Sequence, residues 1–132
     1  MTNEIITFYS KTPPNKFELA DFTIKFSEEN RSCSDNITVF LKIENNTITD
    51  WSFDWITSII TTATSSVFWE SIVWMTLDEI LTKDYNYIVE LIQEEVSPRR
   101  QKSSVFWLLA TRNAIHKYLQ DWITDTFLDI LP

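Results

Sequence analysis

The sequence predicts an α+β fold: a small three-stranded antiparallel sheet with helices packed on one face. Three observations predict it. Apolar residues alternate with polar ones along short segments of the first half, as is typical of strands. Helical spacing replaces this alternation in the second half, and no repeat, low-complexity tract or linker separates the halves. Strands followed by helices within 132 residues indicate one domain over residues 1–132.

The first part of the chain is expected to hold a helix and a strand. Residues 3–9 can form a short helix, which ends at Thr12-Pro13-Pro14-Asn15 because proline cannot continue it. Residues 22–26 alternate cleanly and predict the first strand. A polar loop over residues 28–35 follows and contains the single cysteine of the sequence.

Two further strands are predicted next. Alternation over residues 37–43 gives the second strand. Residues 44–47 form a turn, in which asparagine can adopt the left-handed conformation almost as readily as glycine. The third strand is expected to place on one face the aromatic residues Trp51, Phe53 and Trp55. Its opposite face is expected to carry Asp50, Ser52 and Asp54.

The second half of the sequence predicts helices. One helical face carries the apolar residues Ile60, Ala63, Val67 and Trp74. Small hydroxylated residues dominate positions 61–66, and they permit close packing against a neighbouring element. Thr76 is the expected N-cap of the next helix, with Glu79 at its third position.

The C-terminal part is expected to hold two or three more helices. Residues 85–95 form a short amphipathic helix, and Ser97-Pro98-Arg99-Arg100 interrupts the pattern. Residues 102–120 have the apolar spacing of a long helix. Residues 121–131 either extend this helix or form a last short one.

Glycine is absent from the chain, although average usage of about 7% would give roughly nine. Phosphate-binding loops, dinucleotide fingerprints, EF-hand loops and the nucleophile elbow of α/β hydrolases all need glycine, for positive φ or for close approach of the backbone. The composition therefore excludes most nucleotide enzymes and α/β hydrolases.

The net charge and the cysteine content limit the classes of partner and the cellular compartment that we expect. The net charge of −8 disfavours nucleic acid and anionic membranes as partners. A single cysteine offers no internal disulfide, and the first residues do not resemble a secretory signal, so a cytoplasmic location is expected. The most apolar stretch, residues 67–77, is too short and too polar to span a bilayer.

Cys33 is the most reactive side chain in the sequence. It precedes Asp35 by two residues, and a thiol near a carboxylate can bind a soft or borderline metal; an inert thiol is the alternative interpretation. The one histidine, His116, lies in the middle of the long helix beside Lys117 and is interpreted as a half-exposed surface residue. No local motif of a catalytic triad accompanies either residue, so an enzyme is not expected.

Five short motifs occur in order along nearly the whole chain. They are Pro13-Pro14-Asn15-Lys16-Phe17, Cys33-Ser34-Asp35, Phe53-Asp54-Trp55-Ile56-Thr57-Ser58 followed by Ala63-Thr64-Ser65-Ser66, Trp74-Met75-Thr76-Leu77-Asp78-Glu79, and Arg100-Gln101-Lys102-Ser103 with Ala110. In this order and spacing the chain resembles the iron–sulfur cluster assembly scaffold family, the NifU-like or IscU-like domain, most closely its SufU type. The resemblance implies a SufE/NifU-like α+β fold.

The resemblance also implies a non-enzymatic scaffold that receives sulfur and binds iron, a nascent [2Fe–2S] cluster or zinc. The family's three cysteines correspond to Cys33, Ser58 and Ser103, so one of them is kept. Asp35, which helps to hold the metal in the family, is kept, as is Lys102 beside the third cysteine position. The implied partners are a cysteine desulfurase and other cluster-assembly proteins.

The two replaced cysteines leave two functional alternatives. Zinc or a cluster normally takes four ligands, mostly thiolates, and a serine hydroxyl binds such metals far more weakly. One alternative is a scaffold that receives sulfur at Cys33 and uses Asp35 as a ligand; these are two good ligands at most, and two chains could pool both pairs in a homodimer. The other is a diverged adaptor that keeps the fold and binds proteins through exposed aromatic residues.

The resemblance shows at which positions of the chain a glycine would be expected. Residues that stand where the family usually has glycine are Phe17, Ser34, Trp55, Thr57 and Trp74. Bulky residues at such positions are expected to stiffen or distort the loops that carry the ligands.

Overall fold

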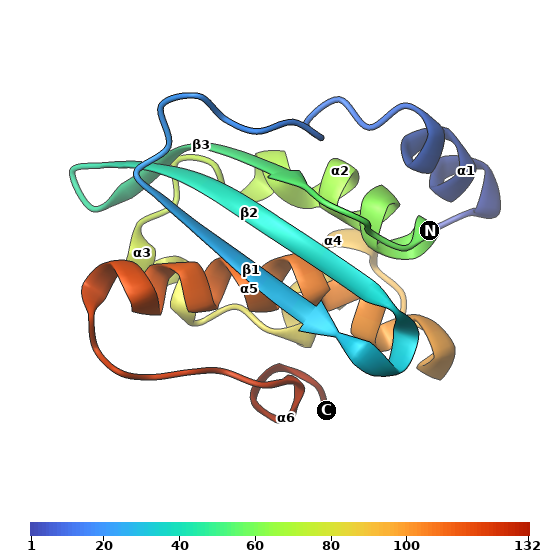
Figure 1. Ribbon diagram of the computed structural model, residues 1–132. Coiled ribbons are helices and arrows are strands. Elements are labelled where there is room, and N and C mark those ends of the chain that lie inside the picture. Colours follow the sequence, from blue (N-terminus) through green and yellow to red (C-terminus); the bar gives the residue numbers. More distant parts are fainter.

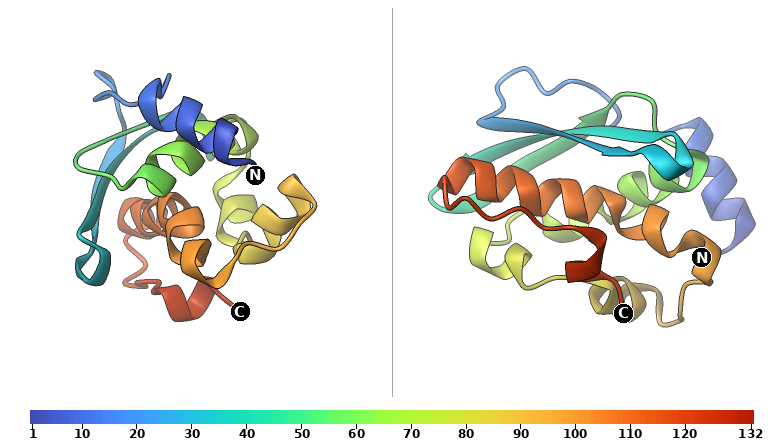
Figure 2. Two further views of the ribbon diagram at one scale, coloured as in Figure 1. Left: turned by 90° about the vertical axis from the view of Figure 1, so that its right-hand side faces the viewer. Right: turned by 60° about the horizontal axis from the view of Figure 1, so that its bottom comes forward.

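The computed structural model describes residues 1–132, with the side chain of Cys33 outside the description. Its three strands, β1 (Ile24–Asn30), β2 (Asp35–Glu44) and β3 (Thr47–Asp54), form an antiparallel sheet in the order β1-β2-β3. Helices α2 (Ile59–Ile72) and α5 (Gln101–Leu119) lie against one face of this sheet, with α5 running along β1 and β2 (Figure 1). The view turned by 90° shows the sheet as one layer with these helices on the same side (Figure 2). The predicted α+β class and the helices on one face are confirmed.

The strands follow the predicted alternation but differ at their ends. β1 spans Ile24–Asn30, β2 spans Asp35–Glu44 and β3 spans Thr47–Asp54. The polar loop predicted over residues 28–35 is shorter than expected, because β1 stays paired with β2 as far as Asn30 and only a 3-10 turn, Arg31–Cys33, separates the two strands. At the β2–β3 turn both asparagines adopt positive φ, as predicted.

The core lies between the sheet and α5. Trp51 and Phe53 of β3 are fully buried, as predicted, and the indole N–H of Trp51 donates to the hydroxyl of Thr111 on α5 at 2.9 Å. The ring of Trp51 meets that of Trp107 edge to face at a centroid distance of 6.1 Å. Trp55 does not share their face, because β3 ends at Asp54 and the backbone of Trp55 turns to φ 91°.

The helices are α1 (Asn3–Lys11), α2 (Ile59–Ile72), α3 (Leu77–Leu81), α4 (Tyr85–Ile92), α5 (Gln101–Leu119) and α6 (Phe127–Ile130), with a 3-10 turn at Pro98–Arg100. Thr76 and Glu79 form the predicted capping box at the start of α3. Trp74 is not on the face of α2, because this helix ends at Ile72 and Trp74 lies in the following loop with φ 77°. The final segment forms a short helix of its own and does not extend α5.

The hydroxylated stretch of α2 is buried on all sides. Thr61, Thr62, Ala63, Thr64, Ser65 and Ser66 are all buried between α1, α5 and the sheet. Their hydroxyls mostly donate to carbonyls one turn earlier in the helix, as Ser66 does to Thr62 at 2.8 Å. Small side chains whose hydroxyls mostly bond within the helix let neighbouring elements approach α2 closely, as predicted. Across the part of the chain described, no helix is long and apolar enough to cross a membrane.

Candidate functional site

The site residues predicted from the sequence come from the starts of three elements. Asp35 opens β2, Ser58 is the N-cap of α2, and Ser103 lies in the first turn of α5. The backbone N–H of Asn36 donates to the carbonyl of Ile56 at 3.0 Å, which ties the start of β2 to the loop before α2. The fold therefore brings distant parts of the sequence together around the N-terminal end of α2.

Asp35 is a fully buried carboxylate with all of its described bonds directed to α2. One carboxylate oxygen accepts from the backbone N–H of Ser58 at 2.8 Å. The other accepts from the Ser58 hydroxyl at 3.1 Å and from the hydroxyl of Thr61. A carboxylate at this position is stabilised by the free N–H groups and the dipole at the start of a helix. Asp35 thus caps α2. It also contacts Ser58, which the family resemblance assigns to the same site.

Ser103 and Lys102 lie in the first turn of α5, next to α2. The carbonyl of Ser103 accepts from the Thr64 hydroxyl at 3.1 Å, so the first turn of α5 packs against the second turn of α2. Lys102 is exposed, and its ammonium lies 5.5 Å from the ring centroid of Phe127 on α6. The ammonium therefore faces α6 and contacts none of the other predicted site residues through an interaction that the structure describes.

The side chain of Cys33 lies outside the described part of the structure, so its predicted role stays a prediction. Its backbone closes the 3-10 turn between β1 and β2, where the flanking Ser32 and Ser34 are exposed. Among the side chains that are described, no group of three or more His, Cys, Asp or Glu residues could hold a metal ion. The donors around α2 are instead mainly hydroxyls.

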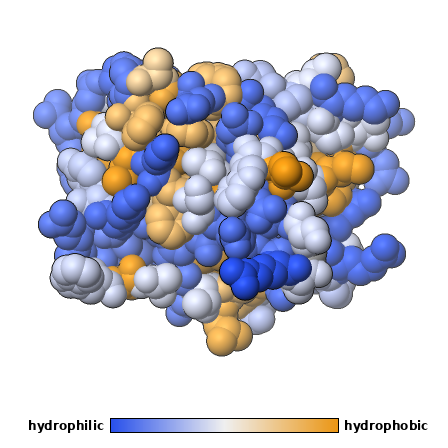
Figure 3. Space-filling view, in the orientation of Figure 1, coloured by the Kyte–Doolittle hydropathy of each residue, from blue (hydrophilic) through white to orange (hydrophobic). Residues whose placement is uncertain are grey.

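Large apolar side chains surround Ser58. Trp55, Ile56 and Ile59 are all exposed, and we refer to these three residues as the loop patch. Figure 3 shows that apolar areas lie separately among hydrophilic ones on one face of the molecule. The sequence analysis did not single out the isoleucines, although two apolar residues beside a motif position were a signal of exposed apolar surface. Thr61 was also missed as a partner of Asp35.

Three of the five positions where a glycine was expected have a backbone that favours glycine. Ser34, Trp55 and Trp74 have φ values of 51°, 91° and 77°. Trp122, which the sequence analysis did not single out, has φ 62°. A side chain with a Cβ at positive φ costs about 1–2 kcal/mol in the left-handed helical region. Phe17 and Thr57, the other two expected positions, do not have positive φ.

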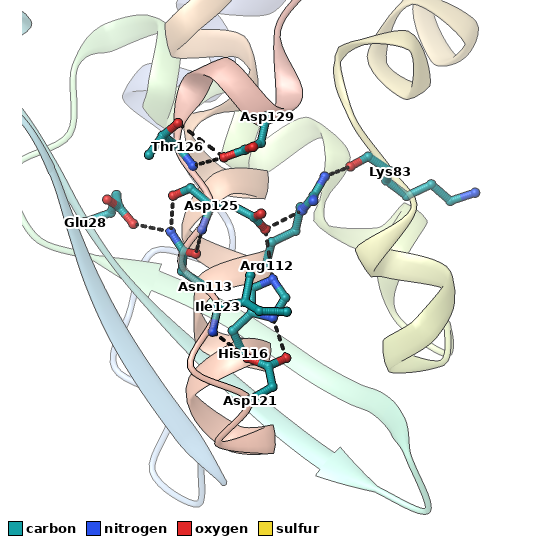
Figure 4. A network of polar contacts seen from close by, with 10 residues as sticks. All are labelled: Glu28, Lys83, Arg112, Asn113, His116, Asp121, Ile123, Asp125, Thr126 and Asp129. Atoms are coloured by element: carbon teal, nitrogen blue, oxygen red, sulfur yellow. Dashed lines mark hydrogen bonds and ion pairs between the residues drawn. The ribbon is translucent and has the colours of Figure 1, made fainter.

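His116 is buried, and the interpretation as a half-exposed surface residue is wrong. It is 6% exposed, because the chain after α5 folds back over it (Figure 4). Its Nδ1 lies 2.7 Å from a carboxylate oxygen of Asp121, and its Nε2 lies 3.0 Å from one of Asp125. The hydrogen bond from His116 is the main cause that lowers the pKa of Asp121. This cluster lies outside the motifs of the candidate site.

Comparison with known proteins finds a matching family model and a related protein. Residues 1–124 match the family model described as the NifU-like N terminal domain. An iron–sulfur cluster assembly scaffold protein IscU from Thermotoga maritima is 30% identical over 82 residues, which cover 62% of this chain and 58% of that protein. The match therefore spans less than two thirds of the relative's length.

Two solved structures have the same fold. A putative iron–sulfur cluster assembly scaffold protein for the SUF system from Fervidobacterium islandicum has a TM-score of 0.70 at 20% identity, over 86% of this chain and 96% of that one. A nitrogen-fixing NifU-like protein (N-terminal) from Brucella abortus has a TM-score of 0.71 at 17% identity, over 90% and 94%. At these identities the likeness shows the fold alone.

Proposed function

Because the chain belongs to the family of NifU-like N-terminal domains, an iron–sulfur cluster assembly scaffold family, we propose that it serves cluster assembly by binding partner proteins and does not hold a complete cluster on a single chain. The observation that carries this proposal is the closed environment of Asp35. The two oxygens of this buried carboxylate accept three hydrogen bonds from Ser58 and Thr61.

The chemistry of the donors argues against a complete cluster site on one chain. The Ser58 hydroxyl donates to Asp35 and accepts from the backbone N–H of Thr61 at 3.2 Å, so a metal ion there would have to displace helix-capping bonds. Hydroxyls are hard ligands, and iron–sulfur clusters are held mainly by thiolates. The residues around α2 therefore do not fit a cluster, and Cys33 supplies one thiol at most.

The loop patch supports a role in binding proteins. Trp55, Ile56 and Ile59 expose large apolar side chains around the start of α2. Large side chains of this kind, tryptophan above all, are the residues that most often anchor protein interfaces. By family resemblance, the partner that we propose for this surface is a cysteine desulfurase.

Charge substitutions in the loop patch test this proposal. We expect Ile56→Asp and Ile59→Asp each to weaken binding to the cysteine desulfurase of the same cell by about tenfold or more in isothermal titration calorimetry. Leu128→Asp is the matched control, because Leu128 is 92% exposed on α6, outside the patch. Unchanged binding by the patch variants, or an equal loss in the control, would contradict the proposed surface.

A second candidate function is a metal site shared between two chains. It is favoured by the position of Cys33 between two exposed serines, which places this turn at the surface two residues from Asp35. Elemental analysis of protein purified without oxygen separates the two functions. We expect far less than one iron or zinc per two chains. One metal per dimer, lost in Cys33→Ala, would establish the shared site.

A further inference from the structure

The C-terminal segment, residues 120–132, is a strap that returns along α5. Gln120 ends α5 with φ 54° and reverses the chain, and the strap then runs beside α5 towards α6 (Figure 2). Two apolar contacts hold its far end. Ile130 is buried, and the ring of Phe127 stacks on that of Phe106 at a centroid distance of 5.8 Å.

His116 holds the near end of the strap through both of its ring nitrogens. Its two partners, Asp121 and Asp125, both lie on the strap, at 2.7 Å and 3.0 Å (Figure 4). An ionised carboxylate can only accept hydrogen bonds, whereas a neutral imidazole has one donor and one acceptor nitrogen. Both contacts are therefore hydrogen bonds only when His116 is an imidazolium ion.

The charges on neighbouring elements fit this arrangement. On α5, the Arg112 Nε donates to the same oxygen of Asp125 at 2.9 Å, and Lys117 faces away, donating to the carbonyl of Lys25 at 3.3 Å. With His116 protonated, two cations on α5 therefore face two carboxylates on the strap.

The remaining neighbours of this cluster reach it through Asn113 or through backbone. Asn113 holds the backbone N–H and carbonyl of Asp125 and donates to Glu28 of β1 at 2.9 Å. Burial raises the pKa of Glu28. The loop before α4 contributes the carbonyl of Lys83, which accepts from Arg112 at 2.8 Å.

We propose that His116 is a pH-dependent clamp, which fastens the C-terminal strap while the imidazole is protonated and loosens it when the proton is lost. A neutral ring must turn a lone pair towards one of the two carboxylates at hydrogen-bond distance. One bond is then replaced by repulsion, inside a site where a buried unpaired group is costly.

Loosening the strap changes the surroundings of the predicted site at the other end of α5. Phe127 is the residue whose ring lies under the ammonium of Lys102, next to Ser103. Once His116 no longer holds the near end, only Ile130 and Phe127 hold the strap, so Phe127 leaves Phe106 and Lys102 more often. The clamp therefore couples proton concentration to the exposure of this end of α5, whether or not the protein binds metal.

Hydrogen exchange measured by mass spectrometry from pH 6 to pH 9 tests the clamp, with rates corrected for the intrinsic effect of pH. We expect the protection of residues 120–132 to fall by about tenfold or more as pH rises, while that of residues 104–115 of α5 stays constant. In His116→Gln the strap should be weakly protected at every pH. Constant strap protection in the wild type, or the same pH dependence in this variant, would overturn the proposal.

Two further measurements test the clamp and its effect on Lys102. Asp121→Ala removes a partly exposed partner and leaves a neutral ring able to donate to Asp125 alone. Its strap should lose most of the pH dependence; a variant that retains all of it would refute the clamp. Amine labelling at pH 6, the lowest pH of this range, should modify Lys102 faster in His116→Gln than in the wild type, relative to the exposed Lys11 of α1. An unchanged ratio would refute the coupling along α5.

Discussion

Replacing Trp74 by glycine should stabilise the protein relative to replacing it by alanine. Trp74 lies between α2 and α3 with φ 77°, and its side chain is 73% exposed. Its backbone N–H donates to the carbonyl of Ile48 on β3 at 2.7 Å, so the fold holds the backbone in this conformation. Alanine is the reference because both variants lose the same partial burial of the indole ring.

The magnitude follows from two opposing terms. A residue with a Cβ pays about 1–2 kcal/mol in the left-handed region, and glycine does not. Glycine gives the unfolded chain more conformations, which costs about 0.4–1 kcal/mol on folding. The difference favours Trp74→Gly over Trp74→Ala by about 0.5–1 kcal/mol. In thermal unfolding this corresponds to a rise in Tm of about 2–4 °C for a chain of this size.

Urea and thermal unfolding of both variants measure this difference, and Trp69 supplies the control. Trp69 lies in the last third of α2, where glycine is about 1 kcal/mol less favourable than alanine. Trp69→Gly should therefore be less stable than Trp69→Ala, the opposite order to that at position 74. If Trp74→Gly is the less stable of its pair, the backbone at this loop does not carry the expected strain.

Two other predictions concern buried carboxylates. Asp35→Asn should lower the free energy of unfolding in urea by about 2–3 kcal/mol. The amide NH₂ of asparagine is a donor, so one of the two Ser58 donors would face another donor in place of a carboxylate oxygen. The control Asp54→Asn, exposed on the same sheet, should change it by less than about 0.5 kcal/mol; equal effects would contradict the capping role. Glu28→Gln should stabilise the protein at pH 7, because burial raises the pKa of Glu28 above 4.5 and its charged form therefore opposes folding, whereas glutamine still accepts from Asn113. This gain should vanish as pH falls below 4.5, where Glu28 is protonated in both states, and a gain that persists there would refute burial of the charge as its cause.

Hydrophobic alternation predicted β2 well, because this strand lies in the middle of the sheet between β1 and β3. Ile37, Val39 and Leu41 of β2 are fully buried, as their period of two requires. The same alternation placed Trp55 one step too far along β3. Side-chain periodicity reports which face a residue occupies while the strand lasts, and it carries no information on the φ value that ends the strand.

Two of the residues that meet at the candidate site could be predicted from the sequence, but their hydrogen bonds could not. The family resemblance assigned Asp35 and Ser58 to one site, and the structure brings them into contact, but the resemblance did not reveal that Thr61 also donates to this carboxylate. His116 was misjudged because its burial depends on a segment that follows α5 and folds back over it. Contacts of this kind depend on where Gln120 turns the chain, which helical spacing alone does not encode.

The tryptophans at positive φ lead to a prediction about the codons at these positions of the gene. Tryptophan is encoded by UGG in the standard genetic code, in which UGA is a stop codon. Where UGA is reassigned, the same codon can be read as tryptophan under one code and as glycine under another. Trp55, Trp74 and Trp122 expose their side chains on a backbone that favours glycine, with Trp122 95% exposed, whereas Trp51 and Trp107 are fully buried in the core. This division predicts UGA at the three exposed positions and UGG at the two buried ones, in a cell that reads UGA as glycine. UGG at all of these positions would make the three strained loops a property of the mature protein and keep Trp55 in the loop patch. UGA at position 55 would leave the loop patch to Ile56 and Ile59, the two residues that the charge substitutions test.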